Sequence, residues 1–431
     1  MQFKRLKKNY KKQIIIGGLI LVCITSAITI TKTRAKYKLT EDIPLVKGTI
    51  NYKEPDMRIM AVNISEDGTN YIETDTIPTE GYNFNSEKSV CKKTTTDLKD
   101  EGITIKYKEG KIDFLGITQK GTKCYLYFDK KEPTASETIL NNITIKEGTP
   151  DFSQIATTDE GVYKVNDGMY GGYSYYWRGS VTNNYVKFGG FCWRIIRING
   201  DSSMRLIYDG SSCHANGTST DDNALGTDQQ YNGANGNSTY VGWTYNTTEQ
   251  RTLAGQDSYL KLATESWYKS KIENNTKNSS KVADGKFCND RNTSNNEPWR
   301  ASGNSQNYAG YDRLYTNYTP SLSCNSGDMY TLKVGAITID EVIFAGGNDQ
   351  INDKYFLYNG KEFWTMTPSQ WYYHGNNYYA KVFVVGNLGA INMNNVSAGF
   401  RRNFCPVINL KADIQFQADG NGTLNNPYVV A

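Results

Sequence analysis

The sequence predicts a mainly β protein with an N-terminal transmembrane helix, a small β-sandwich and a larger α+β domain that contains two short helices. Two observations support this fold class. Apolar and polar residues alternate between residues 36 and 131, which is the period of a strand with one buried face. From residue 151 onward Gly, Asn, Ser and Tyr dominate, and helical spacing recurs only twice. With 431 residues, 38% of them hydrophobic, the chain is long enough for more than one core.

Residues 1–35 are predicted to be a cytoplasmic basic tail and a signal anchor. Six Lys and Arg residues precede position 13, and the run Ile14 to Ile30 carries no charge. Basic residues before an apolar run are typical of an export signal whose N-terminus stays in the cytoplasm. The run is short for a membrane span and long for a cleaved signal, but Thr33-Arg34-Ala35 is a poor cleavage site. We therefore predict an uncleaved, single-pass anchor that places the remaining chain outside the cell; cleavage is the alternative.

The distribution of charge excludes one class of partner. The net charge is +4, and the basic tail alone supplies six positive charges, so the rest of the chain is slightly acidic. A nucleic-acid-binding protein carries its basic excess on a folded domain. The sequence therefore predicts the membrane as a partner, through the N-terminal helix, and no nucleic acid.

Seven cysteines follow the anchor, and no two of them form a C-x-x-C motif. In an exported protein such cysteines are expected to form structural disulfides. We predict a disulfide where two cysteines lie within one compositional segment: Cys91 with Cys124, and Cys288 with Cys324. The sequence assigns no partner to Cys192, Cys213 or Cys405, and the odd number leaves at least one thiol unpaired within the chain.

Residues 36–131 are predicted to form an immunoglobulin-like antiparallel β-sandwich that acts as a stalk. In "GITIKYKEGKIDFLGI" the apolar side chains fall on one face of two short strands separated by a turn. The run "KCYLYF" at 123–128 turns Cys124 inward. Residues 132–160 are polar, contain Pro133 and Pro150, and are predicted to be a linker.

Residues 161–431 are predicted to form the α+β domain. Leu260, Ala263 and Trp267 recur at helical spacing, which predicts a helix near residues 256–272. Thr338 and Glu341 form a capping-box pattern, which predicts a second, short helix. The best strand candidates are residues 194–198, 204–210, 380–386 and 405–410.

Several motifs of this region carry a family resemblance. The segments "YYWRGSVTNNYVKFGGFCWRIIRINGD", "MRLIYDGSSCHANG", "ITIDEVIFAGG", "FWTMTPSQW" and "GNGTLNNPYVV" resemble a group of exported proteins of Gram-positive bacteria. The C-terminal domain of that group is similar to the C-type-lectin-like fold of formylglycine-generating enzymes and of the variable proteins of diversity-generating retroelements. The resemblance covers roughly residues 135–431 and implies a lectin-like fold at the bacterial cell surface. It implies no ligand.

One departure from that group concerns Cys405. Where such sequences read Gly-Val-Arg-Pro before the last core strand, this chain has "FRRNFCPVINL". Cys405 could bond to Cys192 or Cys213, and a buried free thiol is the alternative.

Catalytic and metal-binding patterns are not found. The two histidines, His214 and His374, each stand alone in a Gly- and Asn-rich stretch that is expected to face solvent, and no H-E-x-x-H or G-x-S-x-G motif occurs. The paired cysteines of formylglycine-generating enzymes are not recognisable, so we predict no enzyme. Asp221-Asp222, "GGNDQIND" and residues 419–423 carry oxygen ligands that suit calcium, but none completes a calcium loop. We interpret them as Asx turns and predict no cofactor.

The stretch "WYYHGNNYY" at 371–379 is the predicted ligand-binding surface. Its rings are interrupted by His, Gly and Asn, and it shows no alternation that would separate an inner face from an outer one. Rigid aromatic rings with adaptable amides are typical of binding surfaces. The predicted binding residues here are Trp371, Tyr372, Tyr373, His374, Asn376, Asn377 and Tyr378. By analogy with the retroelement variable proteins, the surface extends to Asn387, Asn392, Asn394, Asn395, Ser397, Phe400 and Arg401.

These features together predict a membrane-anchored surface protein whose lectin-like domain binds a glycan or a protein. The alternative is a structural component of the cell envelope that has no small ligand and whose tyrosines form an outer surface without a partner.

Overall fold

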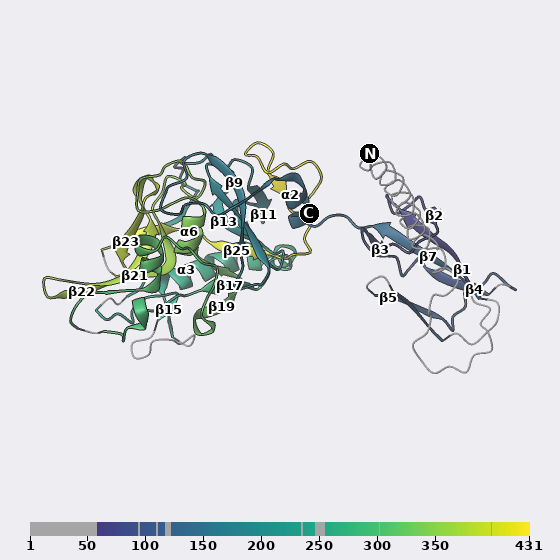
Figure 1. Ribbon diagram of the computed structural model, residues 1–431, viewed down its shortest axis with the longest axis horizontal. Helices are drawn as coiled ribbons and strands as arrows, with labels where there is room; N and C mark the ends of the chain where they lie inside the picture. Colours follow the sequence, from purple (N-terminus) through teal and green to yellow (C-terminus); the bar gives the residue numbers. More distant parts are fainter. Residues whose placement is uncertain are drawn as a thin grey trace, which may run out of the picture. The chain divides into compact units, whose positions relative to one another are not determined.

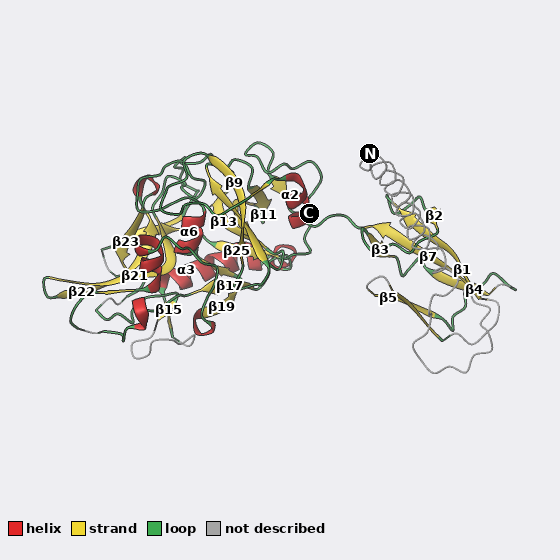
Figure 2. Cartoon of the chain, in the orientation of Figure 1, coloured by secondary structure: helices red, strands yellow, loops and turns green. Residues whose placement is uncertain are grey.

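The computed structural model describes residues 58–431, except 94, 109–110, 117–121, 234–235, 246–254, 301 and 398. Over these residues the chain is mainly β with few helices, as predicted (Figure 2). It divides into two compact units, Met1–Glu132 (unit 1) and Pro133–Ala431 (unit 2). The predicted anchor lies outside the described residues. Within the described part, no helix is both long and apolar enough to cross a membrane.

Unit 1 consists of a five-stranded sheet and a hairpin. The sheet strands are β1 (Arg58–Ser65), β2 (Ile72–Thr74), β3 (Tyr82–Phe84), β4 (Val90–Lys93) and β7 (Thr122–Lys130), and the hairpin strands are β5 (Thr104–Lys108) and β6 (Lys111–Leu115). Strand β7 alternates between buried and half-buried residues, and its inner side chains form one core with Ile112 and Phe114 of β6. Strands β1 and β7 run parallel, so the prediction of a purely antiparallel sandwich is wrong at this pair.

The predicted linker, residues 132–160, is part of unit 2 from Pro133 onward. Helix α2 (Ala135–Asn142) begins at a capping box between Thr134 and Glu137. Ala135 and Ile139 of α2 are buried in the core of unit 2. Strand β8 (Ile145–Lys146) then pairs with the first long strand of the unit. The T-x-x-E pattern at residue 134 was a usable sequence signal, and the polar composition around it concealed the helix.

Two sheets form the frame of unit 2. The nine-stranded sheet contains β8, β9 (Asp159–Asn166), β10 (Tyr173–Gly179), β11 (Tyr185–Phe188), β12 (Phe191–Ile198), β13 (Met204–Gly210), β20 (Val334–Gly335), β25 (Val407–Leu410) and β26 (Tyr428–Val429). The six-stranded sheet contains β14 (Leu225–Gln230), β18 (Gln306–Asn307), β21 (Phe363–His374), β22 (Asn377–Val385), β23 (Ile391–Asn395) and β24 (Arg401–Phe404). The four predicted strands correspond to β12, β13, β22 and β25.

Both predicted helices form, and both lie between these sheets. Helix α3 (Tyr259–Tyr268) contacts β14 and β20, and helix α6 (Ile339–Phe344) contacts β10 and β21 (Figure 2). The predicted capping box of Thr338 and Glu341 is present at the start of α6. The smaller elements are β15 (Thr244–Tyr245), β16 (Gln256–Asp257), β17 (Gly285–Cys288), β19 (Met329–Leu332), α4 (Thr276–Ser279), α5 (Ala309–Tyr311), η1 (Lys269–Glu273), η2 (Ser294–Asn296), η3 (Asp312–Thr316), η4 (Ser326–Asp328) and η5 (Asn387–Gly389).

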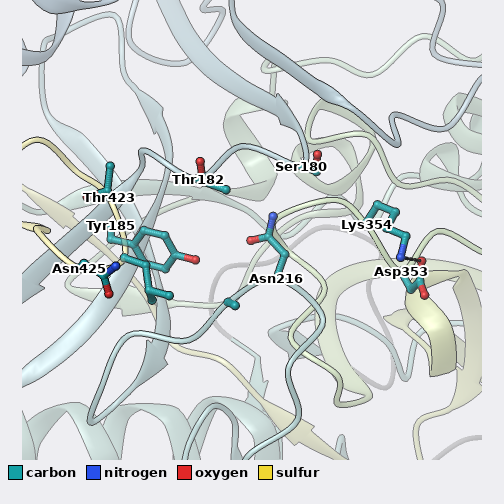
Figure 3. A pocket seen from close by; sticks show the side chains of 10 residues that line it. Ser180, Thr182, Tyr185, Asn216, Asp353, Lys354, Thr423 and Asn425 are labelled. Carbon is teal, nitrogen blue, oxygen red and sulfur yellow. Dashed lines mark ion pairs between the residues drawn. The ribbon is translucent and has the colours of Figure 1, made fainter.

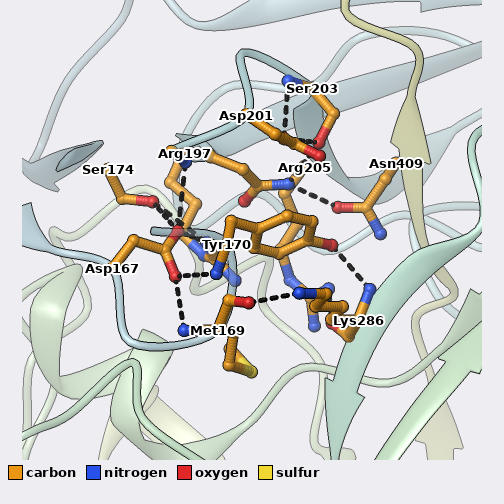
Figure 4. Close-up of polar contacts among 12 residues, drawn as sticks. Asp167, Met169, Tyr170, Ser174, Arg197, Asp201, Ser203, Arg205, Lys286 and Asn409 are labelled. Carbon is orange, nitrogen blue, oxygen red and sulfur yellow. Dashed lines mark hydrogen bonds and ion pairs between the residues drawn. The ribbon is translucent and has the colours of Figure 1, made fainter. Parts of the chain in front are cut away.

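A buried charge network joins β12, β13 and α6. Arg197 of β12 contacts Asp167 and Ser174, as Figure 4 shows, and its Nε lies 3.2 Å from Glu341 Oε1. Arg205 of β13 also pairs with Glu341, and its Nη2 lies 3.3 Å from Oε2. All these charged side chains are almost fully buried. A buried cation requires such partners, because removal from water is costly.

The disulfides match the sequence analysis in part. Both predicted bonds form, Cys91–Cys124 in unit 1 and Cys288–Cys324 in unit 2. A third bond joins Cys192 to Cys213, and Cys405 is a buried free thiol. Of the two alternatives for Cys405, the structure therefore shows the unpaired one.

Candidate functional site

The predicted binding stretch forms the outer half of a long β-hairpin. Strands β21 and β22 are joined by Gly375 and Asn376, both with positive φ, which is the two-residue turn that matches strand twist best. Strand β23 pairs with β22 only as far as Lys381, and β18 pairs with β21 only at Gln370 and Trp371. The tip therefore extends beyond the rest of unit 2 (Figure 1).

The hairpin register separates the rings onto two faces, so the interpretation of an unbroken block without alternation is wrong. Directly opposed pairs are Gln370 with Lys381, Trp371 with Ala380, Tyr372 with Tyr379, Tyr373 with Tyr378, and His374 with Asn377. Opposed residues share a face, and neighbours in sequence point to opposite faces. The His, Gly and Asn residues between the rings form the two-residue turn and the strand ends beside it. They therefore do not show that the stretch lacks two distinct faces.

The inner face of the hairpin is a column of stacked rings. Trp371 stacks on Tyr378 with ring centres 4.7 Å apart, and Tyr378 stacks on Tyr373 at 4.8 Å. The amide of Gly303 donates to the Tyr378 hydroxyl at 3.1 Å, and the amide of Tyr373 donates to Ser305 Oγ at 2.9 Å. Trp371 is fully buried, so its assignment as a ligand-binding residue is wrong.

The outer face consists of Gln370, Tyr372, His374, Asn377, Tyr379 and Lys381. His374 and Asn377 are exposed, and the other four are half-buried. The Tyr372 ring stacks against His374 at 6.0 Å, and Lys381 Nζ lies 4.3 Å from the centre of the Tyr372 ring. This face combines aromatic rings, amides and one cation, which are side chains typical of binding surfaces.

The residues predicted by analogy are not gathered at the tip. Asn395 and Ser397 are buried and bond to each other, which contradicts their assignment as contact residues. Asn392 and Asn394 lie on β23 opposite Val384 and Val382, toward the base of the hairpin. The remaining predicted positions are also accounted for: Asn376 accepts from the Tyr373 hydroxyl within the turn, Asn387 lies in η5 beyond the base, Phe400 is exposed, and Arg401 on β24 pairs with Asp228.

Sequence reasoning missed Gln370 and Lys381. The run "AKVFVV" was interpreted only as a strand that enters the sheet. Counting back from Phe383 in steps of two places Lys381 and Tyr379 on one face, and this was an available signal. The segment from Phe363 to Asn395 contains a single Lys, Arg, Asp or Glu residue, which is Lys381.

A separate hollow of about 480 Å³ lies elsewhere in unit 2 (Figure 3). It is lined by hydroxyl and amide side chains that include Ser180, Thr182 and Asn216. Its two charged residues, Asp353 and Lys354, form an ion pair with each other at 3.4 Å. None of the predicted binding residues lines it.

His214 lies beside this hollow and is held by two carboxylates, whereas the sequence predicted a solvent-facing side chain. Its backbone amide donates to Asp209 Oδ2 at 2.8 Å, and its Nε2 lies 3.2 Å from Asp222 Oδ1. Asp222 also accepts from the hydroxyl and the amide of Ser211. In the part of the chain that the structure describes, no group of three or more His, Cys, Asp or Glu is placed to hold a metal ion.

The buried carboxyl of Asp209 predicts a pH dependence of stability. Burial raises its pKa to about 6 against the opposing effect of Arg194 and of the His214 amide. Because the pKa is higher in the folded state than in the unfolded state, Asp209 makes its full contribution to the free energy of unfolding below about pH 4, where it is protonated in both states. That contribution is lost as the pH rises through about 6. Relative to the wild type, Asp209→Asn should therefore gain about 2–3 kcal/mol in free energy of unfolding between pH 4 and pH 8.

Urea unfolding of both proteins at pH 4 and pH 8 measures this difference directly. Because the pKa of Asp222 is lowered to about 2, its carboxylate stays ionised in the folded protein at both pH values. An unfolding difference that is the same at both pH values would show that Asp209 is not the titrating group.

Comparison with known protein families, curated proteins and solved structures found no match to this chain. The functional argument therefore relies on the geometry of the described residues.

Proposed function

We propose that this chain is a surface-anchored binding protein of a bacterial cell, in which unit 2 is a lectin-like domain carried by unit 1. The outer face of the hairpin is the binding surface for a glycan or a protein. The observation that carries this proposal is the projecting tip, which presents rings, amides and a cation on one face. Exposed aromatic side chains supply contact area at low conformational cost.

The arrangement of unit 2 supports the lectin-like assignment. Its two predicted helices lie between two sheets, and disulfides hold the long loops. Its two ends also meet: the amide of Ala135 donates to the Ile414 carbonyl at 2.7 Å, and the amide of Ala431 donates to the adjacent Gln415 carbonyl at 3.0 Å. A domain whose ends meet leaves its opposite loops free to vary and to bind.

The hairpin is a better candidate than the hollow in Figure 3. The charges in the hollow neutralise each other, and one aromatic ring, Tyr185, lines it beside Ser, Thr and Asn side chains. The outer face presents two tyrosine rings with a cation over one of them, and aromatic rings contribute more to binding energy than short polar groups do.

We expect no catalytic activity at either place. The Ser211 hydroxyl, which is close to His214 in the chain, donates to Asp222 and not to the imidazole. His374 stacks on Tyr372 at the exposed tip, where nothing excludes water. A nucleophile needs a base that accepts its proton. The Thr220 hydroxyl lies 3.2 Å from His214 Nε2, but it donates its proton to Asp222 Oδ1 at 2.8 Å and not to the imidazole.

A double substitution tests the proposed surface. Tyr372→Ala with Tyr379→Ala should reduce binding of the full-length protein to its ligand on a glycan and surface-protein array by more than tenfold, because both rings are lost from one face. Trp371 is left intact, since it is buried and its removal would disturb the fold.

The matched control is Tyr173→Ala. Tyr173 is a strand residue like Tyr372, and a lysine, Lys164, likewise lies over its ring, at 5.8 Å; unlike Tyr372, Tyr173 is exposed. Equal loss in both variants, or equal binding in all three proteins, would contradict the assignment to the hairpin. A protein that binds nothing on the array and only self-associates would support a structural role in the envelope instead.

A further inference from the structure

Within the described part of the chain, the cation on the outer face has no counter-ion. Lys381 is half-buried, and among the described residues its ammonium makes no ion pair and no hydrogen bond. The other Lys and Arg residues within the strands of this six-stranded sheet are neutralised: Arg401 pairs with Asp228 at 3.1 Å and Arg402 with Glu362 at 2.6 Å. Lys381 therefore differs from these two arginines, because it has no ion-pair partner among the described residues.

The position of Lys381 has a cost in the absence of a ligand. Burial lowers the pKa of its ammonium, because part of its hydration is removed. The ring of Tyr372 compensates in part through the cation–π contact. The hairpin itself has no carboxylate that could offset the rest of this desolvation cost, because the segment from Phe363 to Asn395 contains no Asp or Glu. An anionic group of a ligand would fit this position.

The neighbours of Lys381 indicate the rest of the ligand. Gln370 is the residue directly opposite Lys381, and Asn377 lies at the tip of the same face. The Gln370 side-chain nitrogen donates to Asn307 Oδ1 at 2.9 Å, which leaves its carbonyl oxygen to accept from a ligand hydroxyl. Tyr379 is opposite Tyr372 and adds a ring beside the cation. Amides and phenol hydroxyls bind sugar hydroxyls, and a ring packs against the apolar face of a sugar.

On the basis of the proposed function, we propose that the outer face binds a saccharide that carries a carboxylate. The carboxylate pairs with Lys381, the sugar ring packs against Tyr379, and the amides of Gln370 and Asn377 bond to its hydroxyls. An acidic peptide fits less well, because the outer face offers a single cation, and its amides and phenol hydroxyls match sugar hydroxyls better than they match further carboxylates.

Matched pairs of sugars test this proposal with the full-length protein. The probes are trigalacturonate and its methyl ester, sialyllactose and lactose, and a hexaglutamate peptide, each measured by calorimetry at low and high salt. The acidic sugars should bind at least tenfold more tightly than their neutral partners, and 0.5 M NaCl should reduce that preference. In Lys381→Met the preference should disappear, and in Lys164→Met, where a lysine over another tyrosine is removed, it should remain.

The outcomes separate this inference from the proposed function. If neutral and acidic sugars bind equally, or if Lys381→Met keeps the preference, the inference is wrong even if Tyr372→Ala with Tyr379→Ala abolishes binding. If hexaglutamate binds as tightly as trigalacturonate, the saccharide class is wrong. If no sugar binds and the array is also silent, both proposals fail. The wild-type comparison of trigalacturonate with its methyl ester requires no variant to fold.

Discussion

Replacing Glu341 by Gln is expected to reduce the free energy of unfolding of unit 2 by about 3–5 kcal/mol. The Glu341 carboxylate is almost fully buried and pairs with both Arg197 and Arg205. Burial acts to raise its pKa, but the two guanidinium groups outweigh burial, and the pKa is lowered. The amide variant therefore leaves two buried cations with only half of their compensating charge. Gln can still form the capping box with Thr338, so the loss measures the ion pairs.

Asp284→Asn is the matched control for this prediction. Asp284 pairs with Lys333 at 3.1 Å, but both side chains are exposed to solvent. Exposed pairs contribute about 0–1 kcal/mol, so the control should unfold almost like the wild type. Urea denaturation of the three proteins provides the comparison. A loss in Glu341→Gln no larger than that of the control would mean that the pairs of Glu341 with Arg197 and Arg205 do not stabilise the domain.

Removal of the Cys91–Cys124 disulfide should destabilise unit 1 by about 3–4 kcal/mol and leave unit 2 intact. The bond closes a loop of 33 residues between directly paired positions of β4 and β7. The core that it supports is small, with seven buried side chains among the described residues of the unit. A small core has little reserve of stability, so the lost constraint on the unfolded chain has a large effect.

Calorimetry of Cys91→Ala with Cys124→Ala checks this result. The wild type should show two unfolding transitions, because the chain divides into two compact units, and only one of them should shift in the variant. Cys405→Ala serves as the control, since this buried thiol forms no disulfide. A shift of both transitions, or of neither, would contradict the assignment of this bond to the stability of unit 1 alone.

The contrast between Cys288 and Cys192 illustrates where sequence reasoning succeeded and where it stopped. Cys288 and Cys324 lie in one compositional segment, and the predicted bond between them is present. The bond from Cys192 to Cys213 depends on β12 and β13 lying side by side, with the loop after β13 folding back. The composition of a segment does not predict that Cys192 and Cys213 come together, because their approach depends on the pairing of β12 with β13.

The sequence by itself determined the features that depend on neighbours a few residues apart. These include the strand alternation in β5 and β6, the spacing that forms α3, and the capping box of α6. Each is determined by local dihedral preference and by the burial of one face, so a window of the sequence is enough to predict it.

Only the tertiary structure decided which rings of the hairpin are available to a ligand. Trp371 is buried because β18 and the loop at 303–305 lie beside it, and these come from a distant part of the chain. The two-residue turn sets the register that places Lys381 next to Tyr372. A shift of one residue would move every side chain to the other face. The composition of the stretch therefore indicated a binding surface, and the register and the packing of distant segments assigned its residues.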